Sequence, residues 1–443
     1  MLGKSVNQSQ KNLFSPLLIE FIDRGHELVL LGNKIDWKAL EREFAPLYST
    51  TGKPAMPVRF MAGCLMLKHL YNLGDETLAK AWIMNPYMQY FCGAANFQHH
   101  FPCDPSDFVH FRKRIGEAGV EAIFRHSVAI HGKEALSKMV LSDTTVQENN
   151  ITFPTDSKLA KAVIDKCERM AHQLGIKQRQ SYKRTSKQLL RNTHNAQHPK
   201  RKKGARKASL KLKTIAGRVV RELHRKLPAD APPLAKEKLA LFERALNQKR
   251  TDKDKIYSFH KPFTACIAKG KAHKQYEFGN KIGLAINPRE LIVLAIDAFK
   301  GNPHDSTTIE PLLDQMQQLH NYLPKEVVYD RGGKGKPEIQ GVTISTPNKP
   351  LKSDNEYQRR QKRKKFRRRA AIEPVIGHLK AHFRMGQNYL NGEKSSKINA
   401  MLAATAWNLR KWMDKNTSVL FWNLFKKALH RIFFDRPSYK LAL

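Results

Sequence analysis

Three acidic residues fall where the sequence predicts two strand ends and one helix face. Asp143 lies in the β-branched segment 139–146, and Asp330 ends the short strand-like segment EVVYD. Glu373 lies in a long predicted helix, from about 356 to 383. Carboxylates placed in this way can hold two divalent ions about 3.5 to 4 Å apart, an arrangement that stabilises both the attacking and the leaving oxygen in phosphoryl transfer. The pattern therefore predicts metal-dependent chemistry on phosphate groups. The expected ligand is Mg²⁺, with Mn²⁺ as an alternative, because these ions prefer oxygen donors.

The overall charge of the chain predicts a polyanionic partner. It has 79 Lys and Arg against 39 Asp and Glu in 443 residues, a formal net charge of +40. Nucleic acid phosphates are the expected partner of so positive a chain. We expect no membrane-spanning helix, since no stretch approaches the roughly 18 consecutive apolar residues that one requires. The five scattered cysteines predict reduced thiols, and the N-terminus lacks signal-peptide features, so a cytoplasmic location is expected.

Other residues could also carry chemistry. Asp297 and Asp305 compete as metal ligands, although Asp297 can be a simple strand-end residue and Asp305 a helix cap. A zinc site would need Cys92, His99, His100 and Cys103, whose spacing matches no common zinc motif, so buried thiols and surface imidazoles are the favoured interpretation. No glycine-rich phosphate loop ends in Lys-Ser or Lys-Thr, which argues against a nucleotide cofactor.

The pattern of hydrophobic and turn residues divides the chain into several units. Residues 57–130 read as a series of helices, the last of which carries basic residues that could enter a DNA groove or simply face solvent. Strand signals recur at 263–268, 276–286, 291–299 and 342–345. The predicted units are a helical DNA-binding module at 1–135, a catalytic core at 136–177 and 256–385, a basic helical insertion at 178–255 and a helical C-terminal tail at 386–443.

Two stretches concentrate positive charge. In the predicted insertion, Lys202, Lys203 and Arg206 belong to a run with few acids, which favours contact with a DNA backbone over a merely solvated arm. The predicted helix that carries Glu373 holds a second run, including Arg367 and Arg368. On that helix Arg369 can pair with Glu373 from one turn away, and Lys380 can reach a phosphate from the same face.

These residues also carry a family resemblance. The segments SDTT at 142, YDRGGKGK at 329 and RRRAAIEPVIGHLK at 367 resemble the three acidic motifs of DDE-type bacterial insertion-sequence transposases, particularly the insertion-sequence-five family. The helical region PVRFMAGCLMLKHLYNLGDETLAKAW is similar to that group as well. The sequence departs from the family at Phe366, where Tyr is usual, and at Gly333, where an aromatic residue is common.

The resemblance implies an α/β fold with a ribonuclease-H-like catalytic core, in which Asp143, Asp330 and Glu373 are catalytic residues and hold two Mg²⁺ ions. We also expect Arg331 and the basic residues named above to contact DNA. The expected activity is binding of terminal inverted repeats, strand cleavage and transfer to target DNA, by a homodimer in the bacterial cytoplasm or at its nucleoid. Two alternatives stay open from the sequence: a nuclease without strand transfer, and a non-catalytic basic DNA-binding protein.

Overall fold

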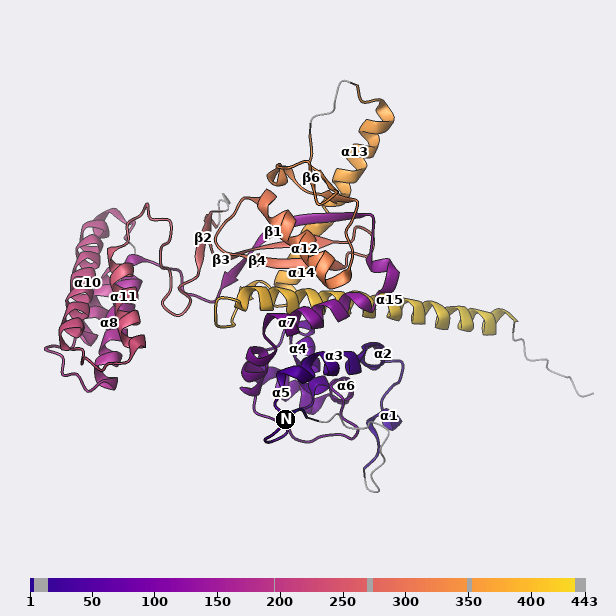
Figure 1. The fold of residues 1–443 in the computed structure, drawn as a ribbon, viewed down its shortest axis with the longest axis horizontal. Coiled ribbons are helices and arrows are strands. Elements are labelled where there is room, and N and C mark those ends of the chain that lie inside the picture. The colour runs from indigo at the N-terminus through magenta and orange to yellow at the C-terminus, as the bar shows by residue number, and fades with distance from the viewer. Residues whose placement is uncertain (4–14, 195, 269–273, 349–352, 435–443) are drawn as a thin grey trace, which may run out of the picture.

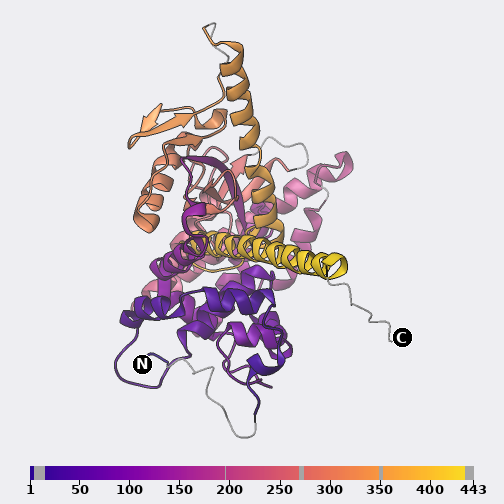
Figure 2. The same cartoon turned by 90° about the vertical axis from the view of Figure 1, so that its right-hand side faces the viewer.

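The computed structural model describes residues 1–3, 15–194, 196–268, 274–348 and 353–434. Figure 1 shows a mixed sheet on one side of a long helix, α15 (Ser395–Phe434), and a group of N-terminal helices on the other side. A separate helical unit lies beyond the end of the sheet where β2 and β3 meet. The view in Figure 2 shows one further helix, α13 (Glu356–Arg369), projecting away from the body of the molecule.

The N-terminal module consists of helices, as the hydrophobic pattern predicts. Its α-helices are α1 (Leu18–Phe21), α2 (Glu27–Lys34), α3 (Trp37–Phe44), α4 (Val58–Leu70), α5 (Asp75–Met84), α6 (Pro86–Phe91) and α7 (Asp107–Ala129), with short 3-10 turns η1 (Ala45–Leu47) and η2 (Gly132–Ala135). Helix α4 ends where Asn72 takes a left-handed φ of 55°. Helix α7 is kinked at Gly116, whose φ of 57° suits a residue without a Cβ.

The central sheet combines antiparallel and parallel strands. Its strands are β1 (Met139–Asn149), β2 (Ala265–Ala268), β3 (Tyr276–Ile286), β4 (Val293–Phe299), β5 (Glu326–Val328), β6 (Glu338–Ile339), β7 (Val342–Ser345) and β8 (Gln387–Asn388). Strands β4, β3 and β1 pair antiparallel, and β5 and β7 continue the sheet parallel to β1. The turn η3 (Asp305–Thr308) and helix α12 (Ile309–His320) connect β4 to β5. The short β6 and β8 are the strands that the sequence did not predict.

The helical insertion begins earlier than the sequence indicates. Its helices are α8 (Asp156–Gln173), α9 (Lys183–Asn192), α10 (Pro199–Lys226) and α11 (Pro233–Asn247). The sequence places residues 136–177, and with them α8, in the catalytic core, because the basic run begins only near residue 178. Its apolar face, however, packs with α10 and α11 in a hydrophobic cluster separate from that of the sheet. The start of the insertion is therefore set by the apolar residues that α8 buries against α10 and α11, and not by where the basic run begins.

The long helix predicted from 356 to 383 is wrong as a single element. The chain forms α13 (Glu356–Arg369) and α14 (Ile372–His382), which are separated at Ala370 and Ala371. No residue of α13 is buried, whereas α14 buries Ile372, Val375 and Leu379 against the core. Pro374 marks this break in the sequence, because a proline has no N–H to donate to the carbonyl four residues earlier, here that of Ala370, and its ring clashes with that carbonyl.

The C-terminal helix is not the appended tail that the sequence suggested. Residues of α15 between Ala400 and Leu409 are almost all fully buried, on every side of the helix. A helix that is apolar all round is expected to lie inside a protein. Here α15 packs on α7 and α4 on one side and on β4 on the other. Asn408 extends this contact, since its side chain accepts from Val293 N and donates to Val293 O, each at 2.9 Å. The last part of the predicted tail, 435–443, lies outside the described residues.

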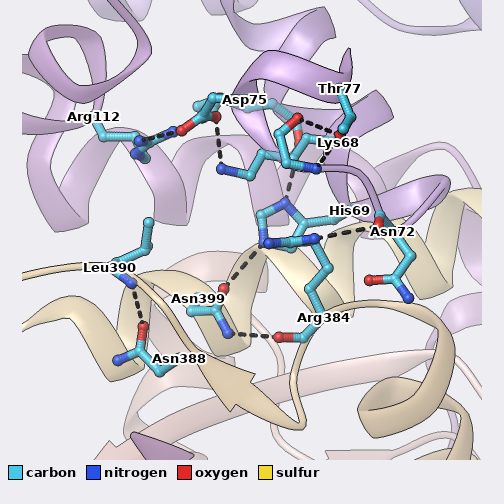
Figure 3. Close-up of polar contacts among 12 residues, drawn as sticks. Lys68, His69, Asn72, Asp75, Thr77, Arg112, Arg384, Asn388, Leu390 and Asn399 are labelled. Atoms are coloured by element: carbon cyan, nitrogen blue, oxygen red, sulfur yellow. Dashed lines mark hydrogen bonds and ion pairs between the residues drawn. The ribbon is translucent and has the colours of Figure 1, made fainter. Parts of the chain in front are cut away.

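A polar cluster also joins the N-terminal module to the segment after α14 (Figure 3). Asp75 accepts from Lys68 at 2.6 Å and from both terminal nitrogens of Arg112, at 3.2 and 3.0 Å. Burial and Arg112 lower the pKa of Lys68 to about 8 despite its contact with Asp75. His69 lies 3.3 Å from Asn399 of α15. Arg112 is therefore engaged inside the protein, which removes one of the cations that we considered for DNA-groove contact.

Replacing Asp75 by Asn should destabilise the protein by about 3 kcal/mol, because it leaves two nearly buried cations without their counter-charge. Urea denaturation followed by tryptophan fluorescence would measure the loss, and Trp37 and Trp82 lie in this module. The matched control is Glu76→Gln, an exposed acid in the same helical turn, which should change the free energy of unfolding by less than about 0.5 kcal/mol. Equal stability of the two variants would contradict this role for Asp75.

Candidate active site

The pairing of β1 with β5 places two of the predicted ligands side by side. The strands are parallel, and Leu141 pairs with Val328. Asp143 and Asp330 each lie two residues beyond that pair, so they reach the same level on neighbouring chain segments. Asp330 follows the strand directly, and its carboxylate accepts a hydrogen bond from Gly333 N at 3.3 Å. The sharp turn after β5 thus holds this carboxylate at the strand end.

The turn after Asp330 needs small residues for a reason that the structure makes plain. A Cβ at Gly332 would lie 2.6 Å from Asp305 Oδ2 and 3.0 Å from Asp330 Oδ1. A Cβ at Gly333 would lie 2.3 Å from the ring of Tyr329, which is fully buried. The aromatic ring at 329 therefore occupies the space beside position 333, where the family commonly has an aromatic residue.

Asp305 proves to be a neighbour of this site and not only a residue at a helix start. Its Oδ1 accepts from Thr144 Oγ1 at 2.9 Å and from Lys281 Nζ at 2.8 Å. Although burial opposes it, these two donors lower the pKa of Asp305 below its ordinary value. The sequence leaves Asp305 as a competing candidate ligand, because a helix cap explains such a residue well. The available signal was the pair His304-Asp305 in a loop between predicted core elements.

Glu373 joins the site through a single arginine. Arg369 Nη1 lies 3.0 Å from Asp143 Oδ2, and Arg369 Nη2 lies 3.2 Å from Glu373 Oε1. The predicted pairing of Arg369 with Glu373 is thus confirmed, and the contact with Asp143 is new. The side chains of Arg369 and Asp143 are only 16% and 17% exposed, whereas that of Glu373 is 64% exposed.

The environment of Asp143 disfavours its ionised form. Burial raises the pKa of the Asp143 carboxyl, and the nearby Asp330 acts in the same direction. The backbone amide of Thr144 and the guanidinium of Arg369 act in the opposite direction without cancelling the effect. A bound cation lowers the free-energy cost of ionising a buried carboxylate that lies close to a second one, which is why such pairs are common ligands of divalent metals.

The donor set fits a hard divalent ion, but the side chains are not yet gathered around one. Among the described residues, no group of three His, Cys, Asp or Glu side chains is close enough to hold a metal. The guanidinium of Arg369 lies between the carboxylates of Asp143 and Glu373 and supplies the positive charge there. The chemistry of the three carboxylates therefore suits Mg²⁺, while the guanidinium of Arg369 bridges Asp143 and Glu373.

Two other candidate ligands, Asp297 and Cys92, have partners elsewhere. Asp297 forms an ion pair with Lys397 of α15 at 3.7 Å. Cys92 is buried, and its sulfur lies 3.7 Å from that of Cys64.

The cations proposed for DNA contact fall into three groups. The insertion contributes three exposed cations on α10, namely Lys202, Lys203 and Arg206. Two more exposed cations lie close to the carboxylates in sequence, since Arg331 follows Asp330 and Arg367 precedes Glu373. Arg368 instead donates from Nε to the carbonyl of Pro288 at 2.6 Å and so anchors α13 to the core. Lys380 is half-buried two turns along α14 from Glu373.

Comparison with known proteins agrees with this geometry. Residues 17–114 match the family model described as "Transposase domain (DUF772)", and residues 249–409 match "Transposase DDE domain". The chain belongs to the DDE transposases. A Rhizobium meliloti relative, "Uncharacterized protein ORF8 in nfe locus", is 37% identical over 187 residues, which are 41% of this chain and 90% of that protein. Comparison with solved structures gives no significant match.

Membership in this family settles the class of chemistry. The transposase is an enzyme with a ribonuclease-H-like core, acts on DNA and depends on a divalent metal. The order β4-β3-β1-β5-β7, with two antiparallel and then two parallel pairings, agrees with that core. The matched range ends at Leu409, so it includes the buried first part of α15. None of the described helices is both long enough and apolar enough to span a membrane.

The close approach at Gly332 gives a test of the site. Gly332→Ala should lower the rate of DNA cleavage by about tenfold to a hundredfold, because the new Cβ displaces the carboxylates of Asp305 and Asp330. Gly377→Ala in α14, where an added Cβ has nothing within 4 Å, is the matched control and should keep the wild-type rate. Circular dichroism would verify that both variants fold. Wild-type activity in Gly332→Ala would show that the carboxylates do not act at this turn.

Proposed function

We propose that this transposase cuts DNA at the terminal inverted repeats of its own insertion sequence and joins the freed 3′ ends to target DNA. Asp143, Asp330 and Glu373 are the proposed catalytic residues and metal ligands. The observation that carries this assignment is the register of β1 and β5, which brings Asp143 and Asp330 to one level, together with the arginine that links Asp143 to Glu373. Asp305 supports the same site by holding Thr144 and Lys281 beside it.

Two Mg²⁺ ions, or Mn²⁺ in their place, would activate the attacking oxygen and stabilise the leaving oxygen when bound. The protein's own contribution is to fix the carboxylates and to bind the phosphates around the scissile bond. Asp330 is oriented by the amide of Gly333, and Asp143 is placed by β1. Because Glu373 is mostly exposed, its position depends on α14 and on its contact with Arg369.

DNA contacts are proposed for the exposed cations around the site and on the insertion. Arg359, Arg363 and Arg367 are exposed and lie four residues apart on α13, so they share one face of that helix. Lys365 and Arg368 anchor the same helix through Glu326 and Pro288. An anchored helix with one free basic face is suited to hold a phosphate backbone near the carboxylates. Arg331 and Lys380 would contact phosphates closer to the reacting bond.

We also propose a role for each domain and an assembly state on DNA. The N-terminal module and the insertion would bind the transposon end, while the sheet with α13 and α14 would carry out catalysis. Two ends must be joined in one event, so we propose a homodimer on DNA. The insertion-sequence-five family is the group we propose within the DDE transposases, acting in the cytoplasm and at the nucleoid.

The catalytic assignment is tested with purified protein, end DNA and Mg²⁺ on a denaturing gel. Wild-type protein should nick and join ends, whereas Asp330→Ala and Glu373→Ala should lose both reactions and keep DNA binding. Glu310→Ala, which removes an exposed acid on α12, is the control and should retain activity. Activity in the Asp330 or Glu373 variant would place the metal site elsewhere.

The same gel, together with DNA binding measured by fluorescence anisotropy, separates the alternatives. Cleavage without joining would support a nuclease, and metal-independent binding without cleavage would support a non-catalytic DNA-binding protein.

The role of the insertion is tested by the salt dependence of DNA binding. Replacing Lys202, Lys203 and Arg206 by Ala should weaken binding and reduce the slope of log K against log salt by about 2 to 3, since each lost phosphate contact removes about 0.9. Fluorescence anisotropy at several salt concentrations would measure the slope. The control exchanges Lys for Arg and Arg for Lys at the same positions, which keeps the charge and should keep the slope. An unchanged slope in the Ala variant would place DNA away from this part of α10.

A further inference from the structure

Arg369 holds a position that is unusual for a side chain whose expected role is to contact DNA. Its two terminal nitrogens point at two different carboxylates, Asp143 at 3.0 Å and Glu373 at 3.2 Å. These carboxylates come from β1 and from the first turn of α14, so the guanidinium is what links the strand to the helix at this point. Only 16% of its side chain is exposed.

The arrangement satisfies an electrostatic requirement of the metal-free protein. Asp143 is mostly buried and lies near Asp330, and an unpaired charge in such a place is costly. The planar guanidinium of arginine can bridge two carboxylates, whereas a lysine ammonium has no such fork. Arg369 therefore stabilises a cluster of acids that would otherwise repel one another.

The same position conflicts with a metal-bound site. A divalent ion held by Asp143 and Glu373 would carry its charge into the region that the guanidinium now occupies, and like charges at such short range repel strongly. Arg369 contacts Asp143 Oδ2 and Glu373 Oε1, and these carboxylates are the ones that would hold the metal. Arg369 must then release at least one carboxylate, and a phosphate is the natural new partner because it accepts a bidentate guanidinium contact.

We propose that Arg369 is a placeholder cation, which holds Asp143 and Glu373 in the metal-free protein and moves to a DNA phosphate when metal binds. This inference rests on the proposed function, since it takes these two carboxylates as metal ligands. It has a thermodynamic consequence. Metal and DNA binding become coupled, and each strengthens the other by the same factor, because DNA gives the displaced guanidinium a partner. The enzyme then assembles its metal site mainly on DNA. Arg369 acts here as a positioning residue.

Metal binding itself, and not activity, tests the proposal. Full-length protein is titrated with Mn²⁺, and free Mn²⁺ is followed by electron paramagnetic resonance, with and without a saturating duplex of the element's terminal sequence. In the wild type we expect DNA to tighten Mn²⁺ binding by about tenfold, within the usual range of such coupling. In Arg369→Gln, Mn²⁺ should bind about tenfold more tightly without DNA, and DNA should add little.

The matched control is Arg363→Gln, which removes the same charge from an exposed position of α13 and should keep the wild-type Mn²⁺ affinity without DNA. If Arg369→Gln does not fold, Arg369→Lys replaces it, because its ammonium cannot reproduce the planar bridge and DNA-free Mn²⁺ binding should still tighten relative to the wild type. Unchanged or weaker Mn²⁺ binding in the folded Arg369 variant would overturn the placeholder role.

A further variant separates this inference from the proposed function. Asp143→Asn should weaken Mn²⁺ binding if Asp143 is a ligand. Weakening in Asp143→Asn combined with no effect in Arg369→Gln would leave the metal site standing and reject the placeholder. No weakening in Asp143→Asn would reject the metal site, and the placeholder with it.

Discussion

The parallel pairing of β1 with β5 is the constraint on which the catalytic arrangement depends. The two strands are separated in sequence by the whole insertion and by β2 to β4, yet Leu141 pairs with Val328 and so fixes Asp143 and Asp330 at one level. A slip by one residue would turn one of the two side chains to the opposite face of the sheet. Val140, Val327 and Val328 are buried at this pairing, so the two strands lie inside the core.

Gathering acids at one place creates repulsion, and the structure offsets it with cations from several elements. Arg369 spans Asp143 and Glu373, and Lys281 of β3 holds Asp305. Each of these three acids is thus paired with a cation, in a chain whose net charge is +40. The rest of the positive charge remains at the surface of α10 and α13, where polyanionic DNA can neutralise it.

The body around the site is a single packed unit, whereas the insertion is not part of it. One hydrophobic cluster runs from the N-terminal helices through α15 to the sheet, and the insertion has its own. Asp75 and Arg112 within the module, and His69 with Asn399 across the boundary, add polar contacts to this body. The N-terminal module is consequently fixed relative to the carboxylates, which constrains where DNA bound to it can enter the site.

Sequence patterns predicted β3 and β7 to the residue, because alternation, β-branched residues and turns are local signals. They failed where the outcome depends on tertiary contacts. The burial of α15 needs a partner on every side, and α8 joins the insertion only through its packing. Asp305 was ambiguous for the same reason, since only the folded chain brings it to Thr144. The break at Ala370 and Ala371 differs, because Pro374 is a local signal for it.

The most direct test of the account is a crystal structure of the enzyme bound to end DNA and Mn²⁺, with an anomalous difference map collected at the manganese edge. The account predicts two peaks about 3.5 to 4 Å apart, bounded by Asp143, Asp330 and Glu373. Peaks elsewhere, for example at Asp297 and Lys397 or beside Cys92, would contradict it.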